Sequence, residues 1–194
     1  LWAPYDLVSF TIPDTVIVIC DRAFSYGLFA SSISELTIPN SVTAIGDSAF
    51  YLCYSLISLT IPNSATSIGD GAFLSCSNLT SLTIPDSVTT IGDSAFSYCS
   101  RLTMLTIPSS VTTIGSNPFV ELKVQLNNES PHFYVEDNVL FTADKKLLIA
   151  YCSRQTSYSI PNSVTSIGDG AFWCSRLTSL TIPDLVTTIG DSAF

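Results

Sequence analysis

Apolar and polar residues follow one another in the same short phrase along most of this chain. In residues 79–96 the phrase reads Leu-Thr-Ser-Leu-Thr-Ile-Pro-Asp-Ser-Val-Thr-Thr-Ile-Gly-Asp-Ser-Ala-Phe. A fixed repeat length of this kind indicates stacked units, each too small to bury a core alone. The sequence therefore predicts a solenoid. The proline after the isoleucine marks the repeats, at spacings of 26, 23, 23, 23, 53 and 22 residues: Pro13, Pro39, Pro62, Pro85, Pro108, Pro161 and Pro183.

Each repeat predicts two short strands and a turn. Leu-x-x-Leu-Thr-Ile has the period-two pattern of a strand near its end, and the proline stops the ladder because it has no N–H. Val-Thr-Thr-Ile predicts a second strand. The glycine that follows it suggests a corner with positive φ or a close backbone approach. Aspartate comes next in Asp47, Asp70, Asp93, Asp169 and Asp191. We expect it to cap a single 3₁₀ or α-helical turn.

A column of phenylalanines closes the phrase and is expected to stack in the core. Its members are Phe24, Phe50, Phe73, Phe96, Phe119, Phe172 and Phe194.

Residues 119–160 interrupt the repeats. The stretch 122–126 resembles a repeat strand, and 139–141 and 147–149 flank a polar segment, which predicts a β-hairpin with a five-residue loop. The segment is apolar and aromatic, so a linker between two domains is disfavoured. We expect one solenoid domain over residues 1–194. Because the chain begins with Leu1, no basic-then-apolar signal segment follows it, and the chain stops in mid-repeat at Phe194, we expect a fragment of a longer chain or a processed product.

Charge and composition narrow the classes of partner. The chain is 46% hydrophobic and 12% charged, with 16 acidic against seven basic residues and a net charge of −9. This balance argues against nucleic acid or an anionic membrane surface as partner. No apolar run approaches the ~20 residues of a membrane-spanning helix.

The repeated phrase, with Ala-Phe-x-x-Cys at its end, resembles the BspA-like class of leucine-rich repeats over nearly all of residues 7–194. The interruption is also similar to an insert of that family, through 117–119, 137–141 and 146–149. The resemblance implies a curved solenoid of parallel strands, in secreted or surface-anchored proteins associated with adhesion to host proteins and other cells. The first repeat, with Cys20 in place of glycine, and 116–118 depart from the pattern.

Cysteine, histidine and aspartate offer little chemistry. Cys53, Cys76, Cys99 and Cys174 share one repeat position, and we favour buried free thiols over a disulfide between neighbouring repeats. No Cys-x-x-Cys pair supports zinc. His132 lacks a catalytic partner at motif spacing. A calcium column of aspartates is disfavoured because the nonapeptide spacing of calcium-binding solenoids is absent. We therefore expect no enzyme, cofactor or metal.

The exposed face of the first strands carries the functional prediction. Thr60, Thr83 and Thr106 align in neighbouring repeats, and a second threonine column runs through Thr66 and Thr89. Threonine also simply suits an exposed strand, and a flat ice-binding plane is disfavoured by curvature. The predicted partner-binding face consists of Ser58, Thr60, Ser81, Thr83, Met104, Thr106, Ser179 and Thr181.

The predicted function is that of an extracellular or cell-surface binding or adhesion module for a protein or glycan. A structural spacer that presents another domain is the alternative.

Overall fold

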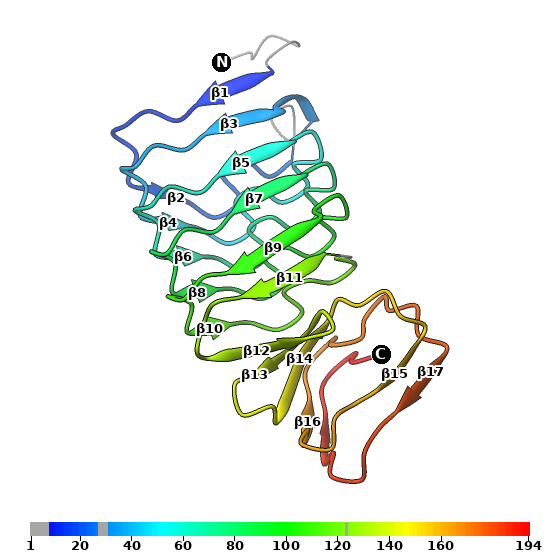
Figure 1. Cartoon of the computed structure of the whole chain (residues 1–194). Coiled ribbons are helices and arrows are strands. Elements are labelled where there is room, and N and C mark those ends of the chain that lie inside the picture. Colours follow the sequence, from blue (N-terminus) through cyan, green and yellow to red (C-terminus); the bar gives the residue numbers. More distant parts are fainter. Residues whose placement is uncertain (1–7, 27–30, 123) are drawn as a thin grey trace.

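The computed structural model describes residues 8–26, 31–122 and 124–194, which form the predicted solenoid of parallel strands (Figure 1). Each regular turn of the coil contributes one longer strand and one two-residue strand, on different sides. The longer strands are β1 (Ser9–Thr11), β3 (Glu35–Thr37), β5 (Ser58–Thr60), β7 (Ser81–Thr83), β9 (Met104–Ile107) and β11 (Gln125–Asn128). The short strands are β2 (Val18–Ile19), β4 (Ala44–Ile45), β6 (Ser67–Ile68), β8 (Thr90–Ile91) and β10 (Thr113–Ile114).

Equivalent residues of neighbouring repeats pair in register. Leu59 lies opposite Leu82, and Thr60 lies opposite Thr83. Because side chains alternate across a strand, Ser-Leu-Thr sends its leucine into the core and its two hydroxyls outward. Leu59 is 4% exposed, whereas Ser58 and Thr60 on either side of it are exposed. One repeated tripeptide thus builds both the core and a polar face.

The third side of the coil consists of turns, and backbone hydrogen bonds join each turn to the turn of the next repeat. Alternate residues donate to the next repeat, as in Ser48 N–H to Asp70 C=O at 2.7 Å and Phe50 N–H to Ala72 C=O at 2.8 Å. The residues between them donate within their own turn, as in Ala49 N–H to Gly46 C=O at 3.3 Å. Ser48 has φ 54°, which a right-handed helix excludes. The segment therefore forms turns where a single helical turn was expected.

The aspartate column ties repeats together. Asp47 Oδ1 accepts the Asp70 N–H at 2.8 Å, and Asp93 Oδ1 accepts the Ser116 N–H at 2.6 Å. The prediction that each aspartate caps its own turn is therefore wrong, because the N–H groups that it accepts belong to the next repeat. The glycine before it allows this approach: a Cβ on Gly69 would lie 2.5 Å from Asp47 Oδ1. The close approach of Asp47 Oδ1, and not a positive φ, explains why glycine is present at position 69.

The phenylalanine column stacks as predicted in the regular repeats. The rings of Phe50 and Phe73 have centroids 5.2 Å apart and an interplanar angle of 8°, and those of Phe73 and Phe96 are 5.6 Å and 2° apart. Phe73 and Phe96 are fully buried. At the end of the column Phe194 is 57% exposed, since a ring stacks on only one of its faces in the described structure.

The interruption contains three antiparallel strands where two were predicted. β12 (Phe133–Glu136) pairs with β13 (Val139–Thr142), which pairs with β14 (Leu147–Tyr151). β12 was not predicted, although Pro131 before it and the turn pair Asp137-Asn138 directly after it were available signals in the sequence. β14 then pairs in parallel with β16 (Ser166–Ile167), and β16 with β18 (Thr188–Ile189). The remaining two-stranded sheet joins β15 (Ser157–Ser159) and β17 (Ser179–Thr181).

Repeats on the two sides of the interruption also contact each other directly. Ser116 Oγ lies 3.5 Å from Asp169 Oδ2, and Trp173 Nε1 donates to the Tyr98 hydroxyl at 3.2 Å. These residues are more than 50 positions apart in sequence, so the turn sides of the two parts remain in contact beside the inserted strands. No helix in the described ranges is long and apolar enough to cross a membrane.

Candidate binding surface

The outward side chains of β5, β7 and β9 form one surface, here called the front face: Ser58, Thr60, Ser81, Thr83, Met104 and Thr106. Thr106 is half-buried and the other five are exposed. In-register pairing places Ser58 beside Ser81 and Thr60 beside Thr83. The structure therefore brings six of the eight predicted residues into one region. The other two, Ser179 and Thr181, are on β17, whose only partner strand in the described structure is β15. They lie beyond the inserted strands (Figure 1).

The two threonine columns differ in how their hydroxyls are used. On the short-strand side, Thr66 Oγ1 donates to the Thr43 carbonyl at 3.2 Å and Thr89 Oγ1 to the Thr66 carbonyl at 3.2 Å. That column therefore binds repeat to repeat. On the front face, the hydroxyls of Thr60 and Thr83 make no hydrogen bond to any described residue, and both residues are exposed. Their donors and acceptors are available to a partner.

A hollow crosses the front face between β7 and β9. It has a volume of about 260 Å³ and includes Ser81, Thr83, Met104 and Thr106 in its lining. β7 and β9 belong to separate sheets, so the longer-strand side is open at this line. Met104 is 52% exposed and supplies an apolar edge to an otherwise hydroxyl-rich surface.

Two residues that sequence reasoning did not select extend these columns. Gln125 pairs with Met104, and Asn127 pairs with Thr106, in the register of β11 on β9. The signal was available, because residues 122–126 were recognised as a repeat strand and Gln125 then falls at the position of Met104. Chemistry along the face thus changes from hydroxyls to carboxamides at β11.

The thiols of the regular repeats are buried and hydrogen-bonded. Cys76 Sγ donates to the Phe50 carbonyl and Cys99 Sγ to the Phe73 carbonyl, each at 3.1 Å. Burial raises the pKa of Cys53 to about 12, and the neighbouring Cys99 thiol together with burial raises the pKa of Cys76 well above its usual value. Cys174 was expected in the same column but is exposed, because its turn is one residue shorter.

The other candidate groups do not gather into a catalytic or metal site. His132 is exposed, and its backbone N–H bonds to Ser130 Oγ at 3.1 Å. In the described part of the chain, no three His, Cys, Asp or Glu side chains lie close enough together to hold a metal ion. Asp144 has a lowered pKa because Thr142 Oγ1 and the Lys146 N–H donate to it, which orders the β13–β14 loop.

The chain belongs to the BspA-type leucine-rich repeat family. The family model, described as a BspA type leucine rich repeat region, matches in six copies over residues 3–126 and 141–194. The family is generally non-catalytic, and its leucine-rich repeats suggest a binding or structural role. No protein of curated function matches the chain.

Solved structures of bacterial proteins have the same fold. The pneumococcal vaccine antigen PcpA superposes with a TM-score of 0.82 at 30% identity, over 96% of this chain and 48% of that one. A leucine-rich repeat protein of Eubacterium ventriosum gives 0.74 at 26% identity, over 97% and 59%. A leucine rich cell surface protein of Faecalibacterium prausnitzii gives 0.52 at 30%, over 97% and 67%. The chain thus spans about half of the first relative.

Proposed function

We propose that this chain is a non-enzymatic module that binds an extracellular or cell-surface protein or glycan through its front face. The observation that carries the proposal is the contrast between the two threonine columns. The hydroxyls of Thr66 and Thr89 donate hydrogen bonds within the fold, whereas those of Thr60 and Thr83 are exposed and have no hydrogen-bond partner in the described structure. An array of aligned hydroxyls without partners can gain affinity from many modest hydrogen bonds.

The setting of the front face is compatible with such a role. None of its six residues is charged, and Met104 offers the kind of exposed apolar contact that anchors an interface. The net charge of −9 favours a neutral or basic partner, and added salt would slow association with a basic one. Relatives named as a cell surface protein and as a vaccine antigen support an extracellular or cell-surface location.

The single-domain organisation expected over residues 1–194 is part of the same proposal. The contacts of Ser116 with Asp169 and of Tyr98 with Trp173 support it, since they join repeats on both sides of the insert. A single cooperative unfolding transition is the expected behaviour of such a unit.

The test uses the triple variant Thr60→Lys, Thr83→Lys and Thr106→Lys. Binding is measured against a panel of extracellular-matrix proteins, purified cell-surface proteins and an array of glycans. The expected result is a loss of binding that the unmodified chain shows, with the melting temperature unchanged. The matched control, Asn63→Lys with Ser109→Lys, adds charge at exposed positions outside the front face and should keep that binding. Equal binding by the triple variant would refute the front-face assignment, and no binding by the unmodified chain would favour a spacer.

A further inference from the structure

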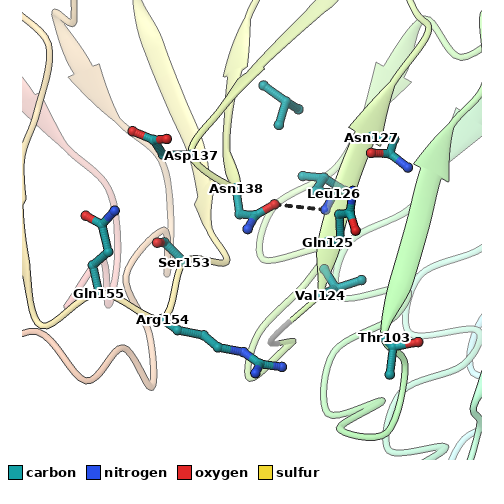
Figure 2. Close-up of a pocket in the computed structure, with 11 residues that line it drawn as sticks. Thr103, Val124, Gln125, Leu126, Asn127, Asp137, Asn138, Ser153, Arg154 and Gln155 are labelled. Carbon is teal, nitrogen blue, oxygen red and sulfur yellow. Dashed lines mark hydrogen bonds between the residues drawn. The ribbon is translucent and has the colours of Figure 1, made fainter.

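A polar groove lies where the longer-strand side of the coil is interrupted, between β11 and the segment that leads into β15. Its volume is about 830 Å³, within the range of ligand sites. In the described structure β11 pairs only with β9, and β15 only with β17. One edge of each strand is therefore left without a neighbouring strand. Figure 2 shows β11 on one wall, with Ser153, Arg154 and Gln155 on the other.

The edge of β11 already accepts a substitute for a neighbouring strand. Leu126 N–H donates to Asn138 Oδ1 at 3.0 Å (Figure 2). In a parallel sheet that N–H would donate to the carbonyl of the adjacent strand. Asn138 occupies the two-residue turn between β12 and β13, where Asp137 and Asn138 have φ of 52° and 60°. A side-chain amide on a turn thus stands where a peptide group of a further strand would stand.

The lining chemistry matches that of a peptide backbone. Gln125, Asn127, Asn138 and Gln155 each present a carboxamide, which offers a planar donor and acceptor pair like that of a peptide group. Val135 is half-buried and adds apolar surface, whereas the side chains of Val124 and Leu126 are buried in the core beneath the groove. Asp137 and Arg154 give the groove charges of both signs. No aromatic side chain is among the described residues that line it, so a sugar ring would find no stacking platform there.

We propose that this groove binds an extended polypeptide segment of a partner, which adds beside β11 through main-chain hydrogen bonds. Strand addition to an exposed sheet edge takes its affinity from the backbone and its selectivity from pockets for alternate side chains. Either Asn138 keeps the Leu126 hydrogen bond and its carboxamide also bonds to the incoming backbone, or the incoming backbone replaces Asn138 Oδ1 as the acceptor of the Leu126 N–H. The site adjoins the front face at β11 but includes none of its six residues, and it stands whether or not that face binds a partner.

The test begins with a displayed library of random twelve-residue peptides selected on the unmodified chain. Enriched peptides are synthesised and their affinities measured by fluorescence anisotropy. Gln155→Trp, which fills the groove from an exposed loop position, should weaken binding by at least about tenfold. Ser81→Trp, a matched addition on the front face, should leave it unchanged. N-methylation of alternate peptide residues should abolish binding in one register only, and the Leu126 amide resonance should shift when the unmodified peptide binds.

Three results would overturn the proposal. One is a selection that yields no peptide sensitive to Gln155→Trp. Another is equal tolerance of N-methylation in both registers, which would show that the backbone is not recognised. The third is glycan binding, detected on an array, that Gln155→Trp abolishes while it changes the binding of no peptide. The double variant Thr60→Lys with Thr83→Lys, assayed with the same peptides, separates the two proposals. Its residues lie on β5 and β7 and do not line the groove, so unchanged peptide binding is expected.

Discussion

The regular repeats from Ser34 to Leu122 and the region from Val124 to Phe194 use the same phrase but differ in continuity. In the first region the hydrogen bonds between neighbouring turns recur at one repeat spacing, and the rings of Phe50, Phe73 and Phe96 are parallel within 8°. In the second, the Tyr151 and Phe172 rings are tilted by 33°. Its buried residues include a separate cluster built around Val139, Phe141 and Phe172.

The difference shows how much variation in repeat length the stack tolerates. Phe24 and Phe50 are 26 residues apart and still stack at 5.2 Å and 8°, whereas the 53-residue step between Pro108 and Pro161 interrupts the column. Both strand ladders stop there, since β10 pairs only with β8 and β11 only with β9 among the described strands. The turn side stays in contact through Ser116 and Asp169. The break opens the groove without separating the two parts.

The largest effect is expected between the exposed Cys174 of the second region and the buried Cys76 and Cys99 of the first. We expect Cys20 and Cys174, which are exposed, to react with iodoacetamide under native conditions within minutes. Cys76 and Cys99 must wait for an opening reaction, so their rate should be lower by roughly 10³ or more. Mass spectrometry of peptides sampled over time measures this ratio. Comparable rates at Cys76 and Cys174, or a Cys76–Cys99 disulfide in the native protein, would contradict the buried-thiol description.

The buried thiols of Cys53 and Cys152 make stability depend on pH in the alkaline range. Burial raises the pKa of Cys53 and of Cys152 from 9.0 to about 12, so in this interval the folded chain binds more protons than the unfolded chain. The stabilisation is fully present below pH 9 and is lost as the pH rises toward 12. Urea unfolding midpoints should therefore fall across this window. A Cys53→Ala variant should show a shallower fall, relative to its own midpoint at pH 8.

Phe96→Ala tests the stacked column. Phe96 is fully buried between Phe73 and Phe119, and its removal should lower the free energy of unfolding by about 3–5 kcal/mol through lost burial and a cavity. Phe194→Ala is the matched control at an exposed end of the column and should cost less than half as much. Urea denaturation followed by circular dichroism gives both values. A loss below about 1 kcal/mol for Phe96→Ala would show that the column does not support the core.

Periodicity made most of the fold predictable, because a repeat that recurs in register dictates which residues stack. Leu59 and Leu82 had to be buried and Thr60 and Thr83 exposed once the strands were placed. Sequence alone could not show where Asp47 and Thr66 direct their polar atoms, since a bond within a turn and a bond to the next repeat use the same residue types. β12 and the position of Asn138 depend on how the insert folds over β11, which no repeat specifies.

Asp93→Ala tests the ladder of aspartates. The change removes the acceptor for the Ser116 N–H and should lower the free energy of unfolding by about 1–2 kcal/mol. Asp93→Asn retains an oxygen at the same position and should cost less than half of that. Asp86→Ala, at an exposed aspartate outside the ladder, should be silent in thermal unfolding. If a chelator lowered the melting temperature of the unmodified chain, the column would have to be reinterpreted as a calcium site.

Asn138→Gly should produce the smallest effect and tests the edge of β11. Glycine tolerates the φ of 60° at this position, so the change removes the carboxamide and leaves the turn unstrained. Leu126 N–H then loses its acceptor, which should cost about 0.5–1.5 kcal/mol and speed hydrogen exchange at that amide. Asp137→Gly is the matched control, since its φ is 52° and its side chain is exposed. If both variants left exchange at Leu126 unchanged, Asn138 would not act as the partner of this strand edge. If only Asn138→Gly speeds it, the Asn138 carboxamide joins this edge of β11 to the inserted strands, alongside the Asn128 carboxamide, which donates to the Phe133 carbonyl of β12 at 2.8 Å.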